Sequence, residues 1–401
     1  MAGPLEGFRI VDFSAVISGP LATMLLADQG ADVIKVEAPG RPDLLRRESY
    51  FRGGLTSIFA NVNRGKRSIV LDLRQPGGLA VAHDLVRGAD VVVENFRPGV
   101  AERLGIGPDD LHAIGDRLVY CRITGYGPTG PRSTQRAYDP VIQGATGYVA
   151  IQTNPEVPIP DLVRNTLVDK ASSYTAAQAI TAALLVRERG AAGQTIELAM
   201  LDAGLAFLWP DGMMKHTFLG EGTTGGAALY ERYHLSETSD GHVVIWTGSE
   251  SEWQALFRAV ERPELIEDPR FATGRARLEN GEELGAILAR EYRKRTTAEL
   301  VARLSQEDVP GGPVAQLDEI PSNEQVIHNQ VLYEAEHPTA GAMRQCRPAP
   351  HFSGTPTTMQ PLAPLEGEHT DDVLAELGYS SERIAELHAT DTVRSAKASD
   401  R

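Results

Sequence analysis

Residues 8–37 read FRIVDFSAVISGPLATMLLADQGADVIKVE and decide the class of fold. The run 8–13 is rich in β-branched and aromatic residues, and residues 31–37 show the same enrichment, so both predict strands. Between them, residues 21–29 space apolar side chains at the helical period, and Gly30 follows as a stop signal. A strand, a helix and a second strand in this order predict a right-handed βαβ unit in a parallel sheet.

The alternation continues along the first half of the chain. Strand patterns occupy residues 68–73, 90–94 and 118–124, and residues 76–88 have the pattern of a helix. In a parallel sheet, ligands bind outside the carboxyl ends of the strands. Three such ends are therefore candidate binding loops: residues 12–19, 37–40 and 94–99.

The second half divides into further segments. An Ala-rich helix is predicted over 169–189 and a strand over 195–201. Beyond residue 220, a strand pattern at 242–246 is followed by helix patterns around 252–260 and 281–293, which indicates a smaller α+β domain. We therefore expect a large domain whose first part is 1–200, a linker at 201–219, a small domain at 220–315, a linker at 316–335, and a return to the large domain at 336–401. In this last segment, helices are predicted at 371–377 and 381–388, and the polar tail 389–401 is expected to fray.

The composition excludes some classes of function. The 401 residues include 39 Lys and Arg against 54 Asp and Glu, a formal net charge of −15, which argues against nucleic-acid binding. Any anionic ligand must therefore be attracted by a local basic cluster. Cys121 and Cys346 are expected to be reduced core thiols. No apolar run has membrane-spanning length and residues 1–7 lack a signal-peptide pattern, so a cytoplasmic protein without membrane contact is expected.

One glycine motif invites a nucleotide-binding interpretation. Residues 125–130 read GYGPTG, match G-x-G-x-x-G and follow a predicted strand. Pro128 and Pro131 stand where the phosphate-binding helix would have to begin, so the motif predicts a rigid loop and no NAD site. The spacings typical of a metal site are absent, and we expect no metal.

Basic residues gather near the predicted strand ends, as Arg64, Lys66, Arg67 and Arg74. They are consistent with a solvated surface, which is the commoner case, or with a site for a phosphate-rich ligand. The sequence leaves these two interpretations open.

Asp169 is the most informative acidic residue because it stands at the head of the Ala-rich helix. There it can cap the helix, a common structural role for aspartate. A carboxylate held ionised and oriented at such a place also has the properties of a nucleophile.

Together, these segments resemble the class III CoA-transferases, the superfamily that also contains α-methylacyl-CoA racemase. The resemblance covers nearly the whole chain and rests on residues 4–7 (PLEG), 11–13 (VDF), 30–37 (GADVIKVE), 63–68 (NRGKRS), 94–99 (ENFRPG), 125–131 (GYGPTGP), 187–203, 240–242 (DGH) and 309–314 (VPGGPV). It implies an α/β fold with a large doubly wound, Rossmann-like domain and a small domain. It also implies a ring-shaped chain that interlocks with a second copy as a homodimer.

The resemblance implies that Asp169 is the nucleophile. Its carboxylate would attack an acyl-CoA, form a mixed anhydride and then an aspartyl-CoA thioester, and pass CoA to an acceptor carboxylic acid. Tyr138 and Asp139 match a Tyr-acid pair near the reacting centre of transferases. A mobile glycine-rich loop, here matched loosely by Gly220, Gly222, Gly225 and Gly226, would exclude water.

The resemblance also maps CoA contacts onto this chain, at Val16, Ile17, Ala38, Leu71, Arg74, Asn95, Phe96, Arg103 and Arg136. Two positions depart from the family pattern. Ile17 replaces a Gln found in some transferases, so Ser18 or a backbone N–H would have to take over an oxyanion contact. Ala38 replaces an Arg found in many members, which weakens a nucleotide clamp there.

Two other functions remain open at this stage. The racemase branch moves a proton next to the thioester with a His and an Asp, but its His would fall at Tyr138, a poor base near neutral pH. Alternatively, the chain is a non-catalytic CoA-binding protein in which Asp169 only caps a helix. The sequence identifies neither the acyl-CoA nor the small carboxylic acid that a transferase would use.

Overall fold

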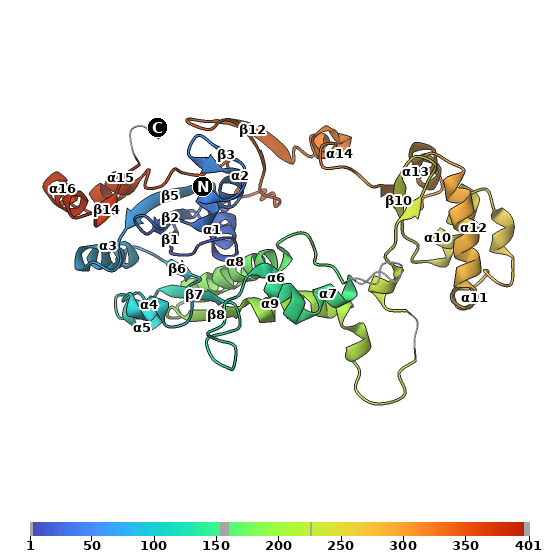
Figure 1. The fold of residues 1–401 in the computed structure, drawn as a ribbon, viewed down its shortest axis with the longest axis horizontal. Coiled ribbons are helices and arrows are strands. Elements are labelled where there is room, and N and C mark those ends of the chain that lie inside the picture. Colours follow the sequence, from blue (N-terminus) through green and yellow to red (C-terminus); the bar gives the residue numbers. More distant parts are fainter. Residues whose placement is uncertain (1–2, 153–159, 225–226, 397–401) are drawn as a thin grey trace. The chain divides into compact units, whose positions relative to one another are not determined.

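The computed structural model describes residues 3–152, 160–224 and 227–396 (Figure 1). It contains two compact units. The first unit comprises Met1–Pro210 and Gln330–Arg401, and the second comprises Asp211–Asn329. The chain thus leaves the first unit, forms the second and returns.

A seven-stranded sheet forms the centre of the first unit, in the order β14-β5-β2-β1-β6-β7-β8. These strands are β1 (Arg9–Asp12), β2 (Asp32–Glu37), β5 (Lys66–Leu71), β6 (Val91–Glu94), β7 (Val119–Thr124), β8 (Thr195–Ala199) and β14 (Val393–Arg394). Only β14 is antiparallel to its neighbour. Starting at β1, the chain adds β2 and β5 on one side, then returns to add β6, β7 and β8 on the other. This is the order of a doubly wound sheet, and its switch point lies between β1 and β6.

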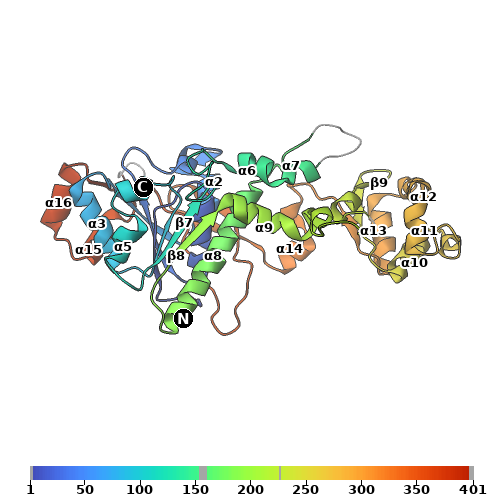
Figure 2. The ribbon, with the colours of Figure 1, turned by 90° about the horizontal axis from the view of Figure 1, so that it is seen from below.

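Helices cover both faces of this sheet (Figures 1 and 2). Those of the first unit are α1 (Ser18–Ala27), α2 (Ser57–Asn63), α3 (Pro76–Arg87), α4 (Val100–Arg103), α5 (Pro108–His112), α6 (Asp139–Thr146), α7 (Tyr148–Ile151), α8 (Leu167–Glu188), α15 (Thr370–Glu376) and α16 (Ser381–Ala389), with α9 (Met200–Gly212) at its boundary. Two small hairpins complete the unit, β3 (Phe51–Arg52) with β4 (Leu55–Thr56), and β12 (Leu332–His337) with β13 (Gly341–Cys346).

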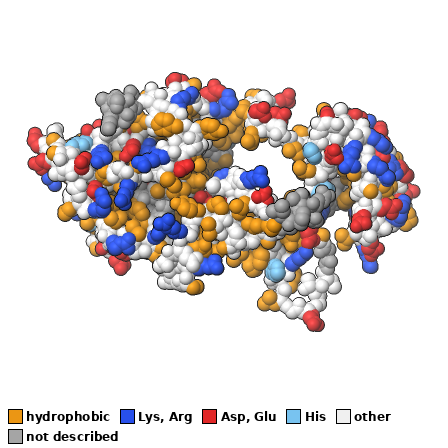
Figure 3. All heavy atoms as spheres, in the orientation of Figure 1, with side chains coloured by type: hydrophobic (Ala, Val, Ile, Leu, Met, Phe, Trp, Pro, Cys, Tyr) orange, Lys and Arg blue, Asp and Glu red, His pale blue; other side chains and the backbone are white. Residues whose placement is uncertain are grey.

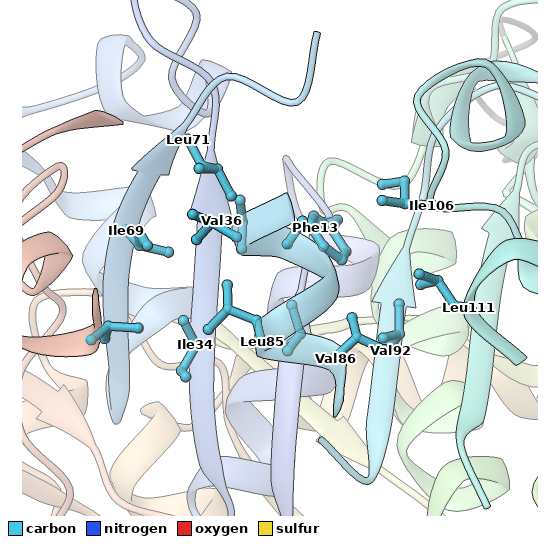
Figure 4. Close-up of a cluster of buried hydrophobic side chains, with 14 of the residues drawn as sticks. Phe13, Ile34, Val36, Ile69, Leu71, Leu85, Val86, Val92, Ile106 and Leu111 are labelled. Atoms are coloured by element: carbon cyan, nitrogen blue, oxygen red, sulfur yellow. The ribbon is translucent and has the colours of Figure 1, made fainter. Parts of the chain in front are cut away.

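The two faces of the sheet differ in chemistry. Ile34, Ile69 and Val92 belong to an apolar cluster that includes Leu85 and Val86 of α3 (Figure 4). The alternate side chains point to the opposite face, beneath α1, and four of them are charged: Asp12, Lys35, Glu37 and Lys66. Burying charges costs free energy unless they are paired and hydrogen-bonded.

Lys66 meets that requirement with three acceptors. Its Nζ lies 2.9 Å from Asp12 Oδ2, 2.8 Å from Asn63 Oδ1 and 2.8 Å from the carbonyl oxygen of Pro20. Burial lowers the pKa of Lys66 to about 8 against the opposing attraction of Asp12. Burial also acts to raise the pKa of Asp12, but Lys66 and Lys35 outweigh it and bring that pKa to about 2.

The basic residues of the cluster found in the sequence are therefore paired with acids of the same chain, and only Arg74 among them is exposed. Arg64 makes two hydrogen bonds to Asp28, of 2.8 and 2.6 Å. Arg67 is paired with Asp32 and Glu376, and the exposed Arg74 is paired with Asp72. These basic residues thus form ion pairs within the chain. From the sequence, only a solvated surface or a phosphate site was expected for them, and the structure shows neither.

Two expectations about this unit are wrong. The tail was expected to fray from residue 389, but Val393 and Arg394 form β14 on the edge of the sheet, and the Val393 side chain is fully buried in the α3 cluster. The prediction of a core position for Cys346 is wrong, because Cys346 lies on the exposed face of β13 with Ala342 and Arg344, whereas Gln345, between Arg344 and Cys346, is buried. Cys121 does lie in the core, and burial raises its pKa to about 12.

The second unit has its own core. An antiparallel sheet in the order β11-β10-β9 is built from β9 (Ser236–Glu237), β10 (His242–Ile245) and β11 (Gly311–Pro313). It is accompanied by α10 (Glu250–Ala259), α11 (Gly274–Glu279), α12 (Gly281–Arg293), α13 (Thr297–Gln306) and α14 (Glu324–His328). Phe257 and Leu300 are fully buried in this core. Acidic and basic side chains are interspersed over the visible surface (Figure 3), so no large field of one sign forms there.

Within the described ranges, no helix combines the length and the apolar character needed to cross a bilayer.

A pair of adjacent glycines tests the packing of α3 on β5. A Cβ at Gly78 would lie 2.1 Å from the carbonyl oxygen of Asp72, whereas a Cβ at Gly77 would first meet the flexible end of Leu387, at 3.3 Å. Gly78→Ala is therefore expected to lower the free energy of unfolding by about 2 kcal/mol or more, because backbone has to shift. Gly77→Ala, the matched control, should leave it unchanged or raise it by up to about 1 kcal/mol, because alanine favours a helix over glycine. Urea unfolding measures both, and equal effects would contradict this packing.

Candidate active site

A cleft opens at the switch point of the sheet, with a volume of about 240 Å³. Its walls come from the loop after β1, from residues 95–98 after β6, from the end of β7 and from residues 135–138. Asp169 is also part of the lining. The carboxyl ends of parallel strands meet here, so side chains distant in sequence converge. Two of the three strand ends singled out from the sequence contribute, and residues 37–40 do not.

Asp169 lies in the first turn of α8, and only 7% of it is exposed. Its backbone N–H donates to Asp139 Oδ2 at 2.9 Å. Burial, together with the nearby Asp139 carboxylate, raises the pKa of Asp169 to about 7. The cap position belongs to Thr166, so the interpretation of Asp169 as an ionised N-cap is wrong. The helix begins two residues earlier than its apolar pattern indicated, so Asp169 belongs to the first turn and does not precede it. Its carboxyl group is buried and poorly hydrated.

Asp139 is the buried first residue of α6 and is not part of the cleft lining. Besides the Asp169 N–H, its carboxylate accepts a hydrogen bond from Gln143 Nε2 at its other oxygen. Gln143 in turn accepts from the N–H of Val163 at 3.0 Å and donates to the carbonyl oxygen of Asn165 at 2.9 Å. Asp139 is therefore placed to fix the head of α8, next to the cleft and not within it.

Tyr138, the residue before α6, contributes to the cleft itself. It is 55% exposed and belongs to the lining, as does the neighbouring Arg136. Because α6 begins between Tyr138 and Asp139, one side chain faces the cleft and the other is turned into the protein.

Asn95 clamps the two loops of the switch point together. Its Oδ1 accepts the backbone N–H of Ala15 at 2.9 Å, and its Nδ2 donates to the carbonyl oxygen of Ala15 at 2.7 Å. Nδ2 also lies 3.3 Å from Ser18 Oγ. The side-chain amide pairs with the backbone of Ala15 as a neighbouring strand would, with one donor and one acceptor, and so links the two loops.

Phe96 is held by a second buried acid. Glu94 Oε2 accepts the Phe96 N–H at 2.7 Å, and Glu94 Oε1 accepts from Arg122 Nε at 2.7 Å. Burial raises the pKa of Glu94, although Arg122 acts to lower it. The pair connects the end of β6 to β7 and so sets the position of the Phe96 backbone on the cleft wall.

Several residues predicted from the sequence lie away from this cleft. Ile17 is buried in an apolar cluster with Phe59, and Leu71 is fully buried in the cluster beneath α3. Ala38, Arg74 and Arg103 do not line the cleft. Of the nine positions expected to contact CoA, the structure brings four together here: Val16, Asn95, Phe96 and Arg136.

Two residues of the cleft were missed as primary candidates. Ser18 was named only as a substitute for the missing Gln, and Arg97 was passed over in favour of Arg103. Arg97 could have been predicted from its place in the loop that follows β6, because ligands bind at the carboxyl ends of parallel strands. Neither Arg97 nor Arg136 has an ion-pair partner in the part of the chain that the structure describes, so the cleft offers two guanidinium groups to an anionic ligand.

The arrangement suits covalent chemistry at a carboxyl group. One buried carboxyl group faces a cleft that also carries two cationic side chains. In the described ranges, no three His, Cys, Asp or Glu side chains are grouped so that they could hold a metal ion.

Comparison with known proteins agrees with this geometry. The family model described as CoA-transferase family III matches residues 5–370. The mouse protein named succinyl-CoA:glutarate CoA-transferase is 34% identical over 392 residues, which are 96% of this chain and 89% of that protein. The Agrobacterium fabrum succinate–glutarate CoA-transferase is 33% identical over 93% of this chain and 96% of its own.

Solved structures give the same result for the fold. The crystal structure of Rv3272 from Mycobacterium tuberculosis superposes with a TM-score of 0.82 at 32% identity, covering 92% of this chain and 99% of that one. A CAIB/BAIF family protein from Brucella suis gives a TM-score of 0.81 at 30% identity, covering 94% and 100%.

The raised pKa of Asp169 predicts a pH-dependent cost to stability. Between about pH 4 and pH 7, the unfolded chain releases this proton and the folded chain retains it, so the stability of the wild-type protein falls as pH rises through this window. Asp169→Asn removes the effect. Relative to wild type, the variant should therefore gain on the order of 3 kcal/mol between pH 4 and pH 8.

Chemical denaturation at several pH values measures this difference. The control is Asp202→Asn, which changes an exposed aspartate in the first turn of α9. Parallel curves for wild type and Asp169→Asn would show that the carboxyl group is well hydrated in the folded protein.

Proposed function

The chain belongs to CoA-transferase family III, and we propose that it moves CoA from an acyl-CoA thioester to a carboxylic acid through covalent intermediates on Asp169. The observation that carries the proposal is the buried Asp169 carboxyl group in the lining of the switch-point cleft. Curated relatives named as CoA-transferases align with nearly the whole chain and support the reaction class.

The reaction divides into two acyl exchanges. The Asp169 carboxylate attacks the thioester carbon, forms a mixed anhydride and expels CoA thiolate. The thiolate then attacks the Asp169 carbonyl carbon of the anhydride, which yields an aspartyl-CoA thioester and releases the first acid. Covalent catalysis thus replaces one difficult transfer with several easier steps, each of which starts from an activated acyl group.

The acceptor acid reverses this order. Its carboxylate attacks the aspartyl thioester, forms a second anhydride and again expels CoA thiolate. The thiolate attacks the acyl carbon of the acceptor, which produces the new acyl-CoA and restores the Asp169 carboxylate. Every bond made on Asp169 is broken again, and no proton is consumed.

Asp169 must be ionised for the first attack. Burial strips water from the carboxylate and raises its pKa to about 7, which makes it a better nucleophile than a hydrated aspartate. Its place in the first turn of α8 puts the anion near the positive end of the helix dipole. The hydrogen bond from its N–H to Asp139 fixes that turn, which gives Asp139 a positioning role.

The remaining cleft residues suit the CoA thioester. Arg97 and Arg136 supply charge for its phosphates, and Asn95 and Phe96 shape the wall between the two loops. Ser18, which lines the cleft where Ile17 does not, is placed to donate to a developing oxyanion. Tyr138 lies beside the reacting centre. Ala38, Leu71, Arg74 and Arg103 would contribute only outside this cleft.

The glycine-rich stretch remains our candidate for a protective loop against hydrolysis of the anhydride. Gly220 and Gly222 both have φ of +93°, a left-handed conformation that glycine adopts at little cost. Gly225 and Gly226 lie outside the described residues.

We further propose that two chains form an interlocked homodimer, each chain an open ring. Each unit exposes large apolar side chains that suit a partner surface, such as Trp209 in the first and Phe218, Leu219 and Leu235 in the second. Among substrates, succinyl-CoA and glutarate deserve the first test, because relatives carry these compounds in their names.

The activity of Asp169 variants tests the nucleophile. Asp169→Asn should lower kcat by about a thousandfold or more with succinyl-CoA and glutarate, because an amide cannot form the anhydride. The Kd for free CoA should change by no more than about twofold. In the wild-type enzyme, kcat/KM should rise with pH through about 7 as the carboxylate forms. Asp202→Asn serves as the control, and normal turnover by Asp169→Asn would refute the mechanism.

Light scattering tests the assembly. A homodimer should give a mass close to twice the 43.3 kDa of one chain, and interlocked rings should keep that mass on dilution to nanomolar concentration. A monomer mass at micromolar concentration would exclude the interlocked arrangement.

A further inference from the structure

Val16 has a backbone conformation that its side chain disfavours. Its φ is +68°, in the left-handed region where a β-branched residue is an outlier. Val16 lies on the wall of the cleft, in the loop between β1 and α1. A strained residue persists only where its surroundings hold it, and such residues cluster at functional sites.

The group that holds Val16 is the carboxylate of Asp43. The Val16 N–H lies 3.1 Å from Asp43 Oδ1 and 3.2 Å from Oδ2, and the Leu45 N–H donates to Oδ1 at 3.0 Å. Asp43 stands in the segment after β2, so it reaches Val16 across 27 residues of sequence.

Lys35 of β2 completes the arrangement from beneath. Its Nζ donates to Asp43 Oδ2 at 2.9 Å and to the carbonyl oxygen of Ser14 at 2.8 Å. Both side chains of the Lys35–Asp43 pair are completely buried. The loop is therefore bound at two points, at the Ser14 carbonyl by the lysine and at the Val16 N–H by the aspartate.

The neighbouring acids have direct partners of their own, although the charge of Lys35 also attracts both of them. Asp12 is bound by Lys66, and Glu37 is bound by Arg46 through hydrogen bonds of 2.8 and 2.6 Å. A buried ion pair is in general weak evidence for stability, since apolar residues of similar volume often serve as well. What apolar residues could not supply is an acceptor for the Val16 N–H and a donor for Ser14.

We propose that Lys35 and Asp43 are positioning residues for the CoA-binding cleft, because their ion pair keeps Val16 in the left-handed conformation that shapes the cleft wall. The identity of the ligand as CoA rests on the proposed function. The pair acts through the loop and does not itself reach the cleft lining.

Calorimetric binding of free CoA to the full-length protein tests this role. Asp43→Asn places an NH₂ group against backbone donors, so the loop should relax and the Kd for CoA should rise about tenfold or more. Adding Val16→Gly to this variant should recover most of the lost affinity, because glycine adopts a positive φ without help. Adding Val16→Ala should not. The melting temperature should stay lowered in all three, since the buried lysine remains without its carboxylate.

This pattern separates positioning from mere stabilisation. A purely structural role would give a loss of affinity that follows the melting temperature and that Val16→Gly fails to restore, and that result would overturn the proposal. A second arm leaves the buried charges intact. Val16→Pro, with φ near −65° and no N–H, should keep the fold and weaken CoA binding about tenfold or more. Unchanged CoA binding by a folded Val16→Pro protein would also overturn the proposal.

Hydrogen–deuterium exchange separates this inference from the proposed function. Faster exchange at residues 14–17 in Asp43→Asn than in the wild type, measured without ligand, is expected whether or not the protein binds CoA. Failure of the wild-type protein to bind CoA would refute the proposed function alone, whereas unchanged exchange in Asp43→Asn would refute the positioning role alone.

Discussion

The reversal of strand order between β1 and β6 is the constraint on which the rest of the site depends. The chain leaves β1 towards one edge of the sheet and later returns to build the other, so the loops that follow these two strands separate at their carboxyl ends. The cleft occupies that separation. Asn95 ties the two loops together through Ala15, and the buried charges beneath α1 fix the same loop from inside. The fold thus creates an opening and then makes its walls rigid.

Asp169 shows how function and stability oppose each other in this fold. A buried carboxyl group with an acidic neighbour resists ionisation, which costs stability wherever the pH demands the anion. Within the proposed mechanism, the same poor hydration activates the nucleophile and protects an anhydride from water. Asp139 accepts the backbone N–H of Asp169 and so fixes the first turn of α8, but its charge also raises the pKa of Asp169. The residue that positions the helix therefore adds to the cost of ionising the carboxyl group.

The sequence predicted the alternation of strands and helices because period and glycine punctuation are local signals. It also placed Asp169 at the head of the correct helix and directed attention to the loops after β1 and β6. What it could not reveal depends on partners distant in the chain. From the sequence, Arg67 was open to two interpretations, a solvated surface residue or part of a phosphate site, but Glu376, 309 residues away, binds it. Ile17 and Ser18 are adjacent, yet only Ser18 faces the cleft, because the register of α1 decides which one is buried.

Direct observation of the loaded aspartate is the sharpest test of the account. The protein is mixed with succinyl-CoA without an acceptor acid, digested, and examined by mass spectrometry. The account predicts a CoA adduct on the peptide that contains Asp169, and hydroxylamine should convert it to the hydroxamate, as expected for an activated acyl bond. An adduct on another residue, or turnover with Asp169 always unmodified, would contradict it.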